Sequence, residues 1–84
     1  MNINVEETVL AILKERGPLP KSSQERANLD YIEAGLVDSL GLMNLVTELE
    51  SALDIELEEE DFMQDKFRTI GGLIETLQQA VARA

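Results

Sequence analysis

The fold is decided by one stretch, Tyr31-Ile-Glu-Ala-Gly-Leu-Val-Asp38-Ser39-Leu40-Gly-Leu-Met-Asn-Leu-Val-Thr-Glu-Leu-Glu50. It begins as a loop and reaches Asp38, a residue type that caps helix N-termini. From Ser39 onward the apolar residues recur at helical spacing and form one stripe. The members of the stripe are Leu42, Leu45, Val46, Leu49 and Leu53. The stretch therefore predicts an amphipathic helix that starts at Ser39 and buries this stripe.

The segment before this stretch predicts one further helix and a long loop. Apolar residues of the helix share one face and are Val5, Val9, Ile12 and Leu13. Asn4 can cap this helix, and the run Gly17-Pro18-Leu19-Pro20 ends it, so we expect it over about 4 to 16. Residues 21 to 28 are polar and are interpreted as loop. The loop is pinned to the core by scattered apolar residues, namely Leu29, Tyr31, Ile32, Leu36 and Val37. Long loops of this kind tend to be functional.

After the central helix, residues 54 to 58 alternate acidic and apolar side chains. One isolated strand has nothing to pair with, so an extended connector is expected, with Ile55 and Leu57 turned inward. Residues 58 to 67 predict a short helix or turn that places Phe62, and with it Phe67, in the core.

Thr69 is expected to cap a last helix. Its apolar stripe consists of Ile70, Leu73, Ile74, Leu77 and Val81. Gly71 and Gly72 each weaken its first turn by about 1 kcal/mol relative to Ala, which indicates close packing there. Together these elements predict an all-α fold, a small four-helix bundle with three long helices and one short. A long loop joins the first two, and one domain covers residues 1–84.

Composition limits the function classes. The 84 residues carry a net charge of −10, which argues against nucleic acid or an anionic membrane as a partner. A basic protein surface is the natural complement, but the charge could equally serve solubility alone. There is no apolar run long enough to span a membrane and no signal-peptide pattern, so we expect a cytoplasmic protein. We also expect it to be a monomer.

The chain contains no Cys and no His, so it lacks thiol chemistry of its own and the usual general base. Residues 37 to 41 lack the first Gly of a nucleophile elbow, so Ser39 is not expected to act as a hydrolase nucleophile. The acidic run from Asp54 imitates a calcium loop, but Glu59 stands where Gly is needed and Asp65 where Glu is needed. Neither catalysis by this chain nor a metal site is expected.

Two interpretations of the helix start remain open. Asp38 and Ser39 either only cap the helix, or Ser39 is modified, in which case a phosphate ester would lie on free N–H groups at the positive dipole end. Leu40 and Met43 fall outside the core stripe. They either pack under the preceding loop or form a partner surface.

The run Glu33-Ala-Gly-Leu-Val-Asp38-Ser39-Leu40, followed by the striped helix, resembles the attachment region of the acyl carrier protein family. The resemblance extends over most of the chain, including the connector from Ile55 to Phe62 and the entry Phe67-Arg-Thr-Ile70 into the last helix. It implies that a phosphopantetheinyl transferase moves 4′-phosphopantetheine from coenzyme A onto Ser39, with Asp38 helping to bind or orient the site. The thiol of this group would carry an acyl group as a thioester, so a chain without Cys or His can take part in acyl chemistry without being an enzyme.

The resemblance also implies a partner surface along the central helix. Its residues would be Leu40, Gly41, Met43, Asn44, Thr47, Glu48 and Glu50. Gly41 and Asn44 stand where fatty-acid carriers usually have acids, so partners of general fatty-acid biosynthesis are expected to bind poorly.

Residues 35 to 41, Gly-Leu-Val-Asp-Ser-Leu-Gly, are also similar to the same region of D-alanyl carrier proteins. We therefore expect a stand-alone carrier of acyl or aminoacyl groups in a specialised pathway. Its partners would be the transferase, a loading ligase, and an acyltransferase or synthase with basic docking surfaces. The alternatives are a general fatty-acid carrier and an unmodified acidic interaction module.

Overall fold

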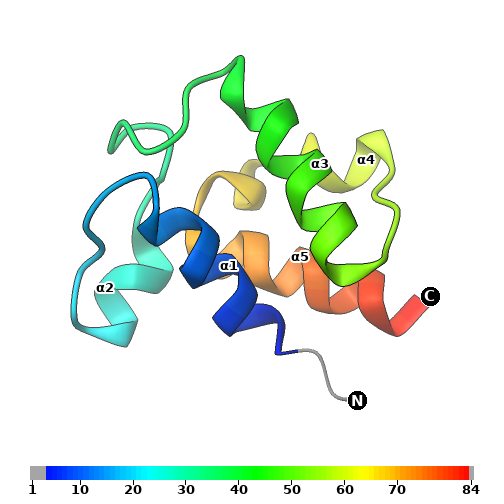
Figure 1. Ribbon diagram of the computed structural model, residues 1–84, viewed down its shortest axis with the longest axis horizontal. Helices are drawn as coiled ribbons and strands as arrows, with labels where there is room; N and C mark the ends of the chain where they lie inside the picture. Colours follow the sequence, from blue (N-terminus) through cyan, green and yellow to red (C-terminus); the bar gives the residue numbers. More distant parts are fainter. Residues whose placement is uncertain (1–3, 84) are drawn as a thin grey trace.

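The computed structural model describes residues 4–83 and arranges them as packed helices joined by loops (Figure 1). In chain order the elements are α1 (Val5–Lys14), α2 (Ser23–Asn28), α3 (Gly41–Leu53), α4 (Glu59–Phe62), the 3₁₀ helix η1 (Asp65–Arg68) and α5 (Ile70–Arg83). Over residues 4–83 the sole β pairing is an isolated bridge between Asp30 and Thr69. The prediction of a small all-α bundle is confirmed.

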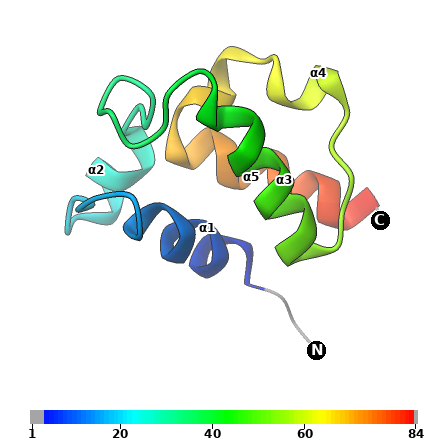
Figure 2. The same cartoon turned by 45° about the horizontal axis from the view of Figure 1, so that its top comes forward.

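The core lies between α1, α3 and α5, which converge in both views of the molecule (Figures 1 and 2). Its fully buried aliphatic residues come from the three predicted stripes and include Val9, Leu13, Leu45, Leu49, Leu73 and Leu77. Leu42, Ile74 and Val81 are partly buried at the margin of the same cluster. The periodicity of the sequence therefore identified the packing faces of the long helices correctly.

Helix α1 is shorter than the expected 4 to 16. The Asn4 side chain accepts a hydrogen bond from the Glu7 amide at 3.0 Å, so the predicted cap is confirmed. At the other end the helix stops at Lys14, and the Arg16 amide donates to the Leu13 carbonyl at 2.9 Å. This tighter turn closes the helix before the glycine at position 17 is reached.

The interpretation of residues 21 to 28 as loop was wrong, because this segment contains α2. The Ser22 hydroxyl accepts from the Glu25 amide at 3.4 Å and caps the helix. None of the residues of α2 is buried, so the helix has no apolar stripe that would reveal it. The available signal was the pair Ser22 and Glu25, which has the spacing of a capping box.

The connector at residues 54 to 58 has no strand, as expected, and Ile55 is buried while Leu57 is half-buried. After it, α4 and η1 take the place of the single short helix or turn. Phe67 is fully buried, whereas Phe62 is half-buried and meets the Phe67 ring edge-on, with centroids 6.4 Å apart. The predicted core position is therefore confirmed for Phe67, whereas Phe62 packs against the margin of the core.

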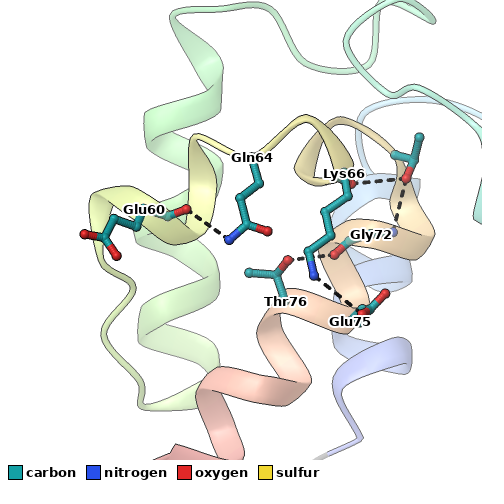
Figure 3. A network of polar contacts seen from close by, with 7 residues as sticks. Glu60, Gln64, Lys66, Gly72, Glu75 and Thr76 are labelled. Atoms are coloured by element: carbon teal, nitrogen blue, oxygen red, sulfur yellow. Dashed lines mark hydrogen bonds and ion pairs between the residues drawn. The ribbon is translucent and has the colours of Figure 1, made fainter.

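Close packing at the start of α5 is confirmed and involves the backbone of η1 (Figure 3). The Thr69 hydroxyl accepts from the Gly72 amide at 3.1 Å, as predicted for the cap. A Cβ atom on Gly72 would overlap the Lys66 carbonyl oxygen, and one on Gly71 would lie 2.9 Å from the Ala27 carbonyl oxygen. The two glycines therefore let η1 and α2 lie directly against α5.

Candidate functional site

The start of α3 is built around Asp38. Its carboxylate oxygen Oδ1 accepts the Gly41 amide at 2.5 Å, and its carbonyl accepts the Leu42 amide at 2.9 Å. Asp38 therefore accepts amides of the helix start, as predicted, but it does so through a turn, because the residue that flanks the regular helix is Leu40 and its side chain makes no capping hydrogen bond. The regular helix begins at Gly41, two residues later than expected, because Ser39 and Leu40 form the capping turn.

Gly41 makes room for this cap. A Cβ atom at this position would lie 2.9 Å from the Asp38 Oδ1 atom, closer than ordinary van der Waals contact. A side chain at position 41 would push the carboxylate away from the amide that it accepts. Gly41 thus has a structural effect next to Ser39.

Ser39 is exposed and lies in the turn that directly precedes α3, at the end of the loop. Two N–H groups of the helix start, those of Gly41 and Leu42, are already bound by Asp38. Within residues 4–83 no acceptor contacts the amides of Ser39 and Leu40. The N–H groups of the helix start that are free to bind a phosphate ester on Ser39 are therefore those of Ser39 and Leu40.

The loop before Ser39 is fastened to the core by Tyr31. The ring is fully buried and its hydroxyl donates to the Phe67 carbonyl. Burial raises the pKa of the Tyr31 hydroxyl well above its usual range, and the Asp30 charge adds to this, while Arg68 acts in the opposite direction. The Tyr31 carbonyl in turn accepts the amides of residues 36 and 37, and Val37 is buried. The predicted pinning of the loop is thus confirmed at Tyr31 and Val37.

Asp30 is a second anchor, and the sequence did not single it out. Its Oδ1 atom accepts the amides of Ile32 and Glu33 at 3.0 Å each, and its Oδ2 atom lies 3.3 Å from the Arg68 guanidinium. Gly35 follows with a φ of +83°, a conformation that side-chain-bearing residues adopt at a cost. An Asp that accepts amides two and three residues on is a common turn, so the signal was present.

The outward side of α3 exposes apolar area. Leu40 is 86% exposed and Met43 is 53% exposed, so packing under the preceding loop is excluded for Leu40. Asn44 and Thr47 are exposed as well, and the Thr47 hydroxyl donates to the Met43 carbonyl at 2.9 Å. Gly41 is half-buried. Met63, just beyond α4, is 69% exposed and was not anticipated.

The two acidic residues predicted for this surface have partners within the chain. Glu48 lies 3.4 Å from the Arg16 guanidinium of the segment after α1. Glu50 is half-buried and its carboxylate accepts the Leu57 amide at 2.8 Å, which holds the connector against α3. Contact of either carboxylate with a partner protein stays a prediction.

In the part of the chain that the structure describes, no three acidic side chains lie close enough together to hold a metal ion. None of the helices within residues 4–83 is long and apolar enough to cross a bilayer. An open groove lies elsewhere, against α1 and α2.

Comparison with known proteins gives a consistent result. Residues 7–77 match the profile of a family described as "phosphopantetheine attachment site". D-alanyl carrier proteins of Streptococcus pyogenes serotype M5 (strain Manfredo) and serotype M49 (strain NZ131) are each 27% identical over 77 residues. These alignments cover 92% of this chain and 95% of each relative. No solved structure matches the chain significantly.

Proposed function

Since the chain belongs to the family of phosphopantetheine-bearing carrier proteins, we propose that the group is attached through the hydroxyl of Ser39. The observation that carries this assignment is the position of the residue. Ser39 is exposed, follows a loop anchored by Tyr31, and directly precedes the helix capped by Asp38. A transferase can therefore reach its hydroxyl without unfolding any part of the bundle.

In the attachment step the Ser39 oxygen forms a bond to the phosphorus on the pantetheine side of the coenzyme A pyrophosphate, the bridging P–O bond of that pyrophosphate breaks, and the nucleotide part leaves with the bridging oxygen. The serine proton is proposed to pass to a base of the transferase; this chain has no His, the side chain that most often serves as a general base. The attached group supplies the thiol that carries an acyl or aminoacyl residue as a thioester. Because the donor is coenzyme A, the proposal also places the chain in the cytoplasm, and the chain itself contributes no catalytic residue.

Asp38 has two effects on the attached phosphodiester. Its carboxylate fixes the turn that presents Ser39 by accepting the Gly41 amide. The same carboxylate already neutralises the positive end of α3, and like charges repel. A phosphodiester on Ser39 is therefore directed toward solvent and the two remaining amides, where partner enzymes can reach the arm.

Partner enzymes of a carrier include a phosphopantetheinyl transferase and ligases or synthases. For this chain they are proposed to contact the outward side of α3, with Leu40 and Met43 as apolar anchors and Asn44 and Thr47 beside them. Both apolar side chains are at least half exposed. The apolar core of an interface needs accessible side chains of this kind, whereas solubility is not improved by exposing them. Basic side chains of a partner would complement the acidic chain, with Glu48 and Glu50 at the margin of the surface.

The cargo is proposed to be an aminoacyl or specialised acyl group, delivered by a dedicated ligase and consumed by an acyltransferase or synthase. The similarity to D-alanyl carrier proteins over 92% of the chain supports this proposal. A second support is the resemblance noted at position 41, where fatty-acid carriers usually have an acid and this chain has Gly; any side chain there would meet the Asp38 carboxylate. General fatty-acid biosynthesis is the competing assignment, and loading by fatty-acid enzymes at normal rates would favour it.

Attachment at Ser39 is tested by intact-mass spectrometry after coexpression with a broad-specificity phosphopantetheinyl transferase. The wild type is expected to gain the mass of one phosphopantetheine group, and Ser39→Ala is expected to gain none. Ser51→Ala is the matched control, because Ser51 is an exposed serine further along α3. Modification that persists in Ser39→Ala, or an unmodified wild type, would contradict the assignment.

The cargo is tested separately on the modified protein. A ligase that loads D-alanine onto one of the matched relatives is compared with a fatty-acid acyltransferase, and thioester formation is followed by mass. Faster loading by the acyltransferase would overturn the specialised pathway while leaving the attachment site intact. The loading rates of the variant Gly41→Glu are measured with the same two enzymes. A changed rate with one of them shows which enzyme is sensitive to an acid at this position.

A further inference from the structure

A groove of about 540 Å³ lies on the side of the bundle formed by α1, the segment after α1, and α2. None of the residues that line it belongs to α3 or to the turn at residues 38–40. Leu10, Ala11 and Leu19 contribute apolar lining, and three cations, Lys14, Lys21 and Arg26, stand among them. Figures 1 and 2 show α1 and α2 side by side with the connecting segment looped between them.

The distribution of cations over the molecule is uneven. The chain has seven Lys and Arg residues. Four of them pair with carboxylates, in the ion pairs Arg16–Glu48, Lys66–Glu75, Arg68–Asp30 and Arg83–Asp61. The remaining three have no ion-pair partner among residues 4–83, and all three line this groove. In a chain with 17 acidic residues, cations without carboxylate partners are therefore gathered at one place.

Arg26 is held in position by the groove wall. Its Nη1 atom donates to the Lys21 carbonyl at 2.7 Å and to the Pro20 carbonyl at 3.2 Å. A guanidinium has five N–H donors, so the group keeps further donors for an incoming anion. Because these backbone contacts already immobilise the side chain, less conformational entropy is lost when it binds a carboxylate.

One carboxylate, that of Glu7, also lies in the lining. Glu7 and Lys14 are seven residues apart on α1, which is about 10 Å along a helix axis. The positive charge is therefore confined to the end of the groove where α1 stops and the segment to α2 begins.

We propose that this groove binds a short acidic segment of a partner protein, with an apolar side chain on the lining and carboxylates on Lys14, Lys21 and Arg26. The volume is within the usual range of about 300 to 1,000 Å³ for ligand sites, which suits a few side chains and not a whole domain face. The net charge of −10 repels an anionic bilayer over its full surface, whereas a short segment meets only the local cations. Neither Ser39 nor any residue of α3 lines the groove, so this binding goes beyond the carrier function and does not depend on it.

The probe is the peptide acetyl-Glu-Leu-Asp-Leu-Glu-amide, titrated into the full ¹⁵N-labelled chain at low ionic strength. Its counterpart acetyl-Gln-Leu-Asn-Leu-Gln-amide has the same apolar residues without the charges. The acidic peptide is expected to shift the amide signals of residues 10–14 and those of Leu19, Lys21 and Arg26 in a saturable manner, more weakly as salt is added. The neutral peptide is expected to bind less tightly.

Variants locate the interaction. Lys14→Gln with Lys21→Gln is expected to weaken binding by up to about fivefold for each charge removed. Lys66→Gln, which removes a cation outside the groove, is the matched control and should bind like wild type. Ala11 is an exposed helical residue in the lining, so Ala11→Glu should fold normally and abolish binding.

Several results would overturn the proposal. They are equal binding of both peptides, shifts located on α3 or α4 instead, and the absence of saturable shifts up to millimolar peptide. In a separate titration, vesicles of phosphatidylglycerol are added to the labelled chain in place of the peptide. If they shift the groove residues while the acidic peptide does not, the surface binds lipid headgroups and the proposal is wrong.

Discussion

Replacement of Tyr31 by Phe isolates one hydrogen bond between the loop before Ser39 and η1. The hydroxyl donates to the Phe67 carbonyl from a side chain that is 0% exposed. Phe keeps the ring and its packing. The substitution therefore mainly removes the hydrogen bond and leaves the Phe67 carbonyl buried without this donor. Such a loss costs about 1 to 3 kcal/mol. A domain of this size has a total unfolding free energy of only about 4 to 12 kcal/mol.

The unfolding free energy is measured by urea titration followed by far-ultraviolet circular dichroism. The midpoint is expected to fall with an unchanged slope, because the same surface is exposed on unfolding. In thermal melts the midpoint should fall by about 4 to 8 °C for each kcal/mol lost. Thr47→Val is the matched control: it also removes a hydroxyl that donates to a backbone carbonyl, but from an exposed position, so its effect should stay within about 0.5 kcal/mol.

The raised pKa of Tyr31 adds a test in alkaline solution. Only the neutral hydroxyl is accommodated in the fold, whereas the unfolded chain loses its proton above the usual tyrosine pKa of about 10. The contribution of Tyr31 is therefore complete below pH 10 and declines as the pH rises above it. The difference in unfolding free energy between wild type and Tyr31→Phe should shrink over this range. Equal stability of the two proteins at pH 7, or a difference that grows with pH, would refute the argument.

The other predictions concern single contacts. Gly72→Ala should lower the thermal midpoint by the equivalent of about 1 to 3 kcal/mol or more, because its Cβ atom would overlap the carbonyl of η1; a raised midpoint, as expected from helix propensity alone, would contradict this. The Arg83 hydrogen bond holds the pKa of Asp61 below its usual range, so the stabilisation relative to Asp61→Asn should be present at pH 7 and lost as the pH falls below about 4; urea titrations at both pH values check this, and a difference that persists at low pH would argue against the contact. Gly41→Ala should slow modification of Ser39 without raising stability, because the Asp38 cap that it displaces offsets the gain in helix propensity; a faster transferase reaction would count against the proposed role of the cap.

Local signals in the sequence were sufficient for the long helices and for the capped turn at the candidate site. The stripe of α3 is buried at Leu45, Val46, Leu49 and Leu53, as its spacing predicts. Asp38, Asn4 and Thr69 accept the amides expected of caps. Each of these features depends on residues at most a few positions apart along one helix, so the chain encodes them locally.

The tertiary structure decided what depends on residues distant in the chain. The hydroxyl of Tyr31 meets a carbonyl 36 positions away, and Phe67, not Phe62, fills the core beneath the loop. Helix α2 buries none of its own side chains, so hydrophobic periodicity could not reveal it. The cations of the groove come from α1, from α2 and from the segment between them. Only the folded chain shows that the other four Lys and Arg residues form ion pairs and that these three have no ion-pair partner within residues 4–83. Periodicity reports which face of a helix is buried, but only the packed chain determines which side chains meet across elements.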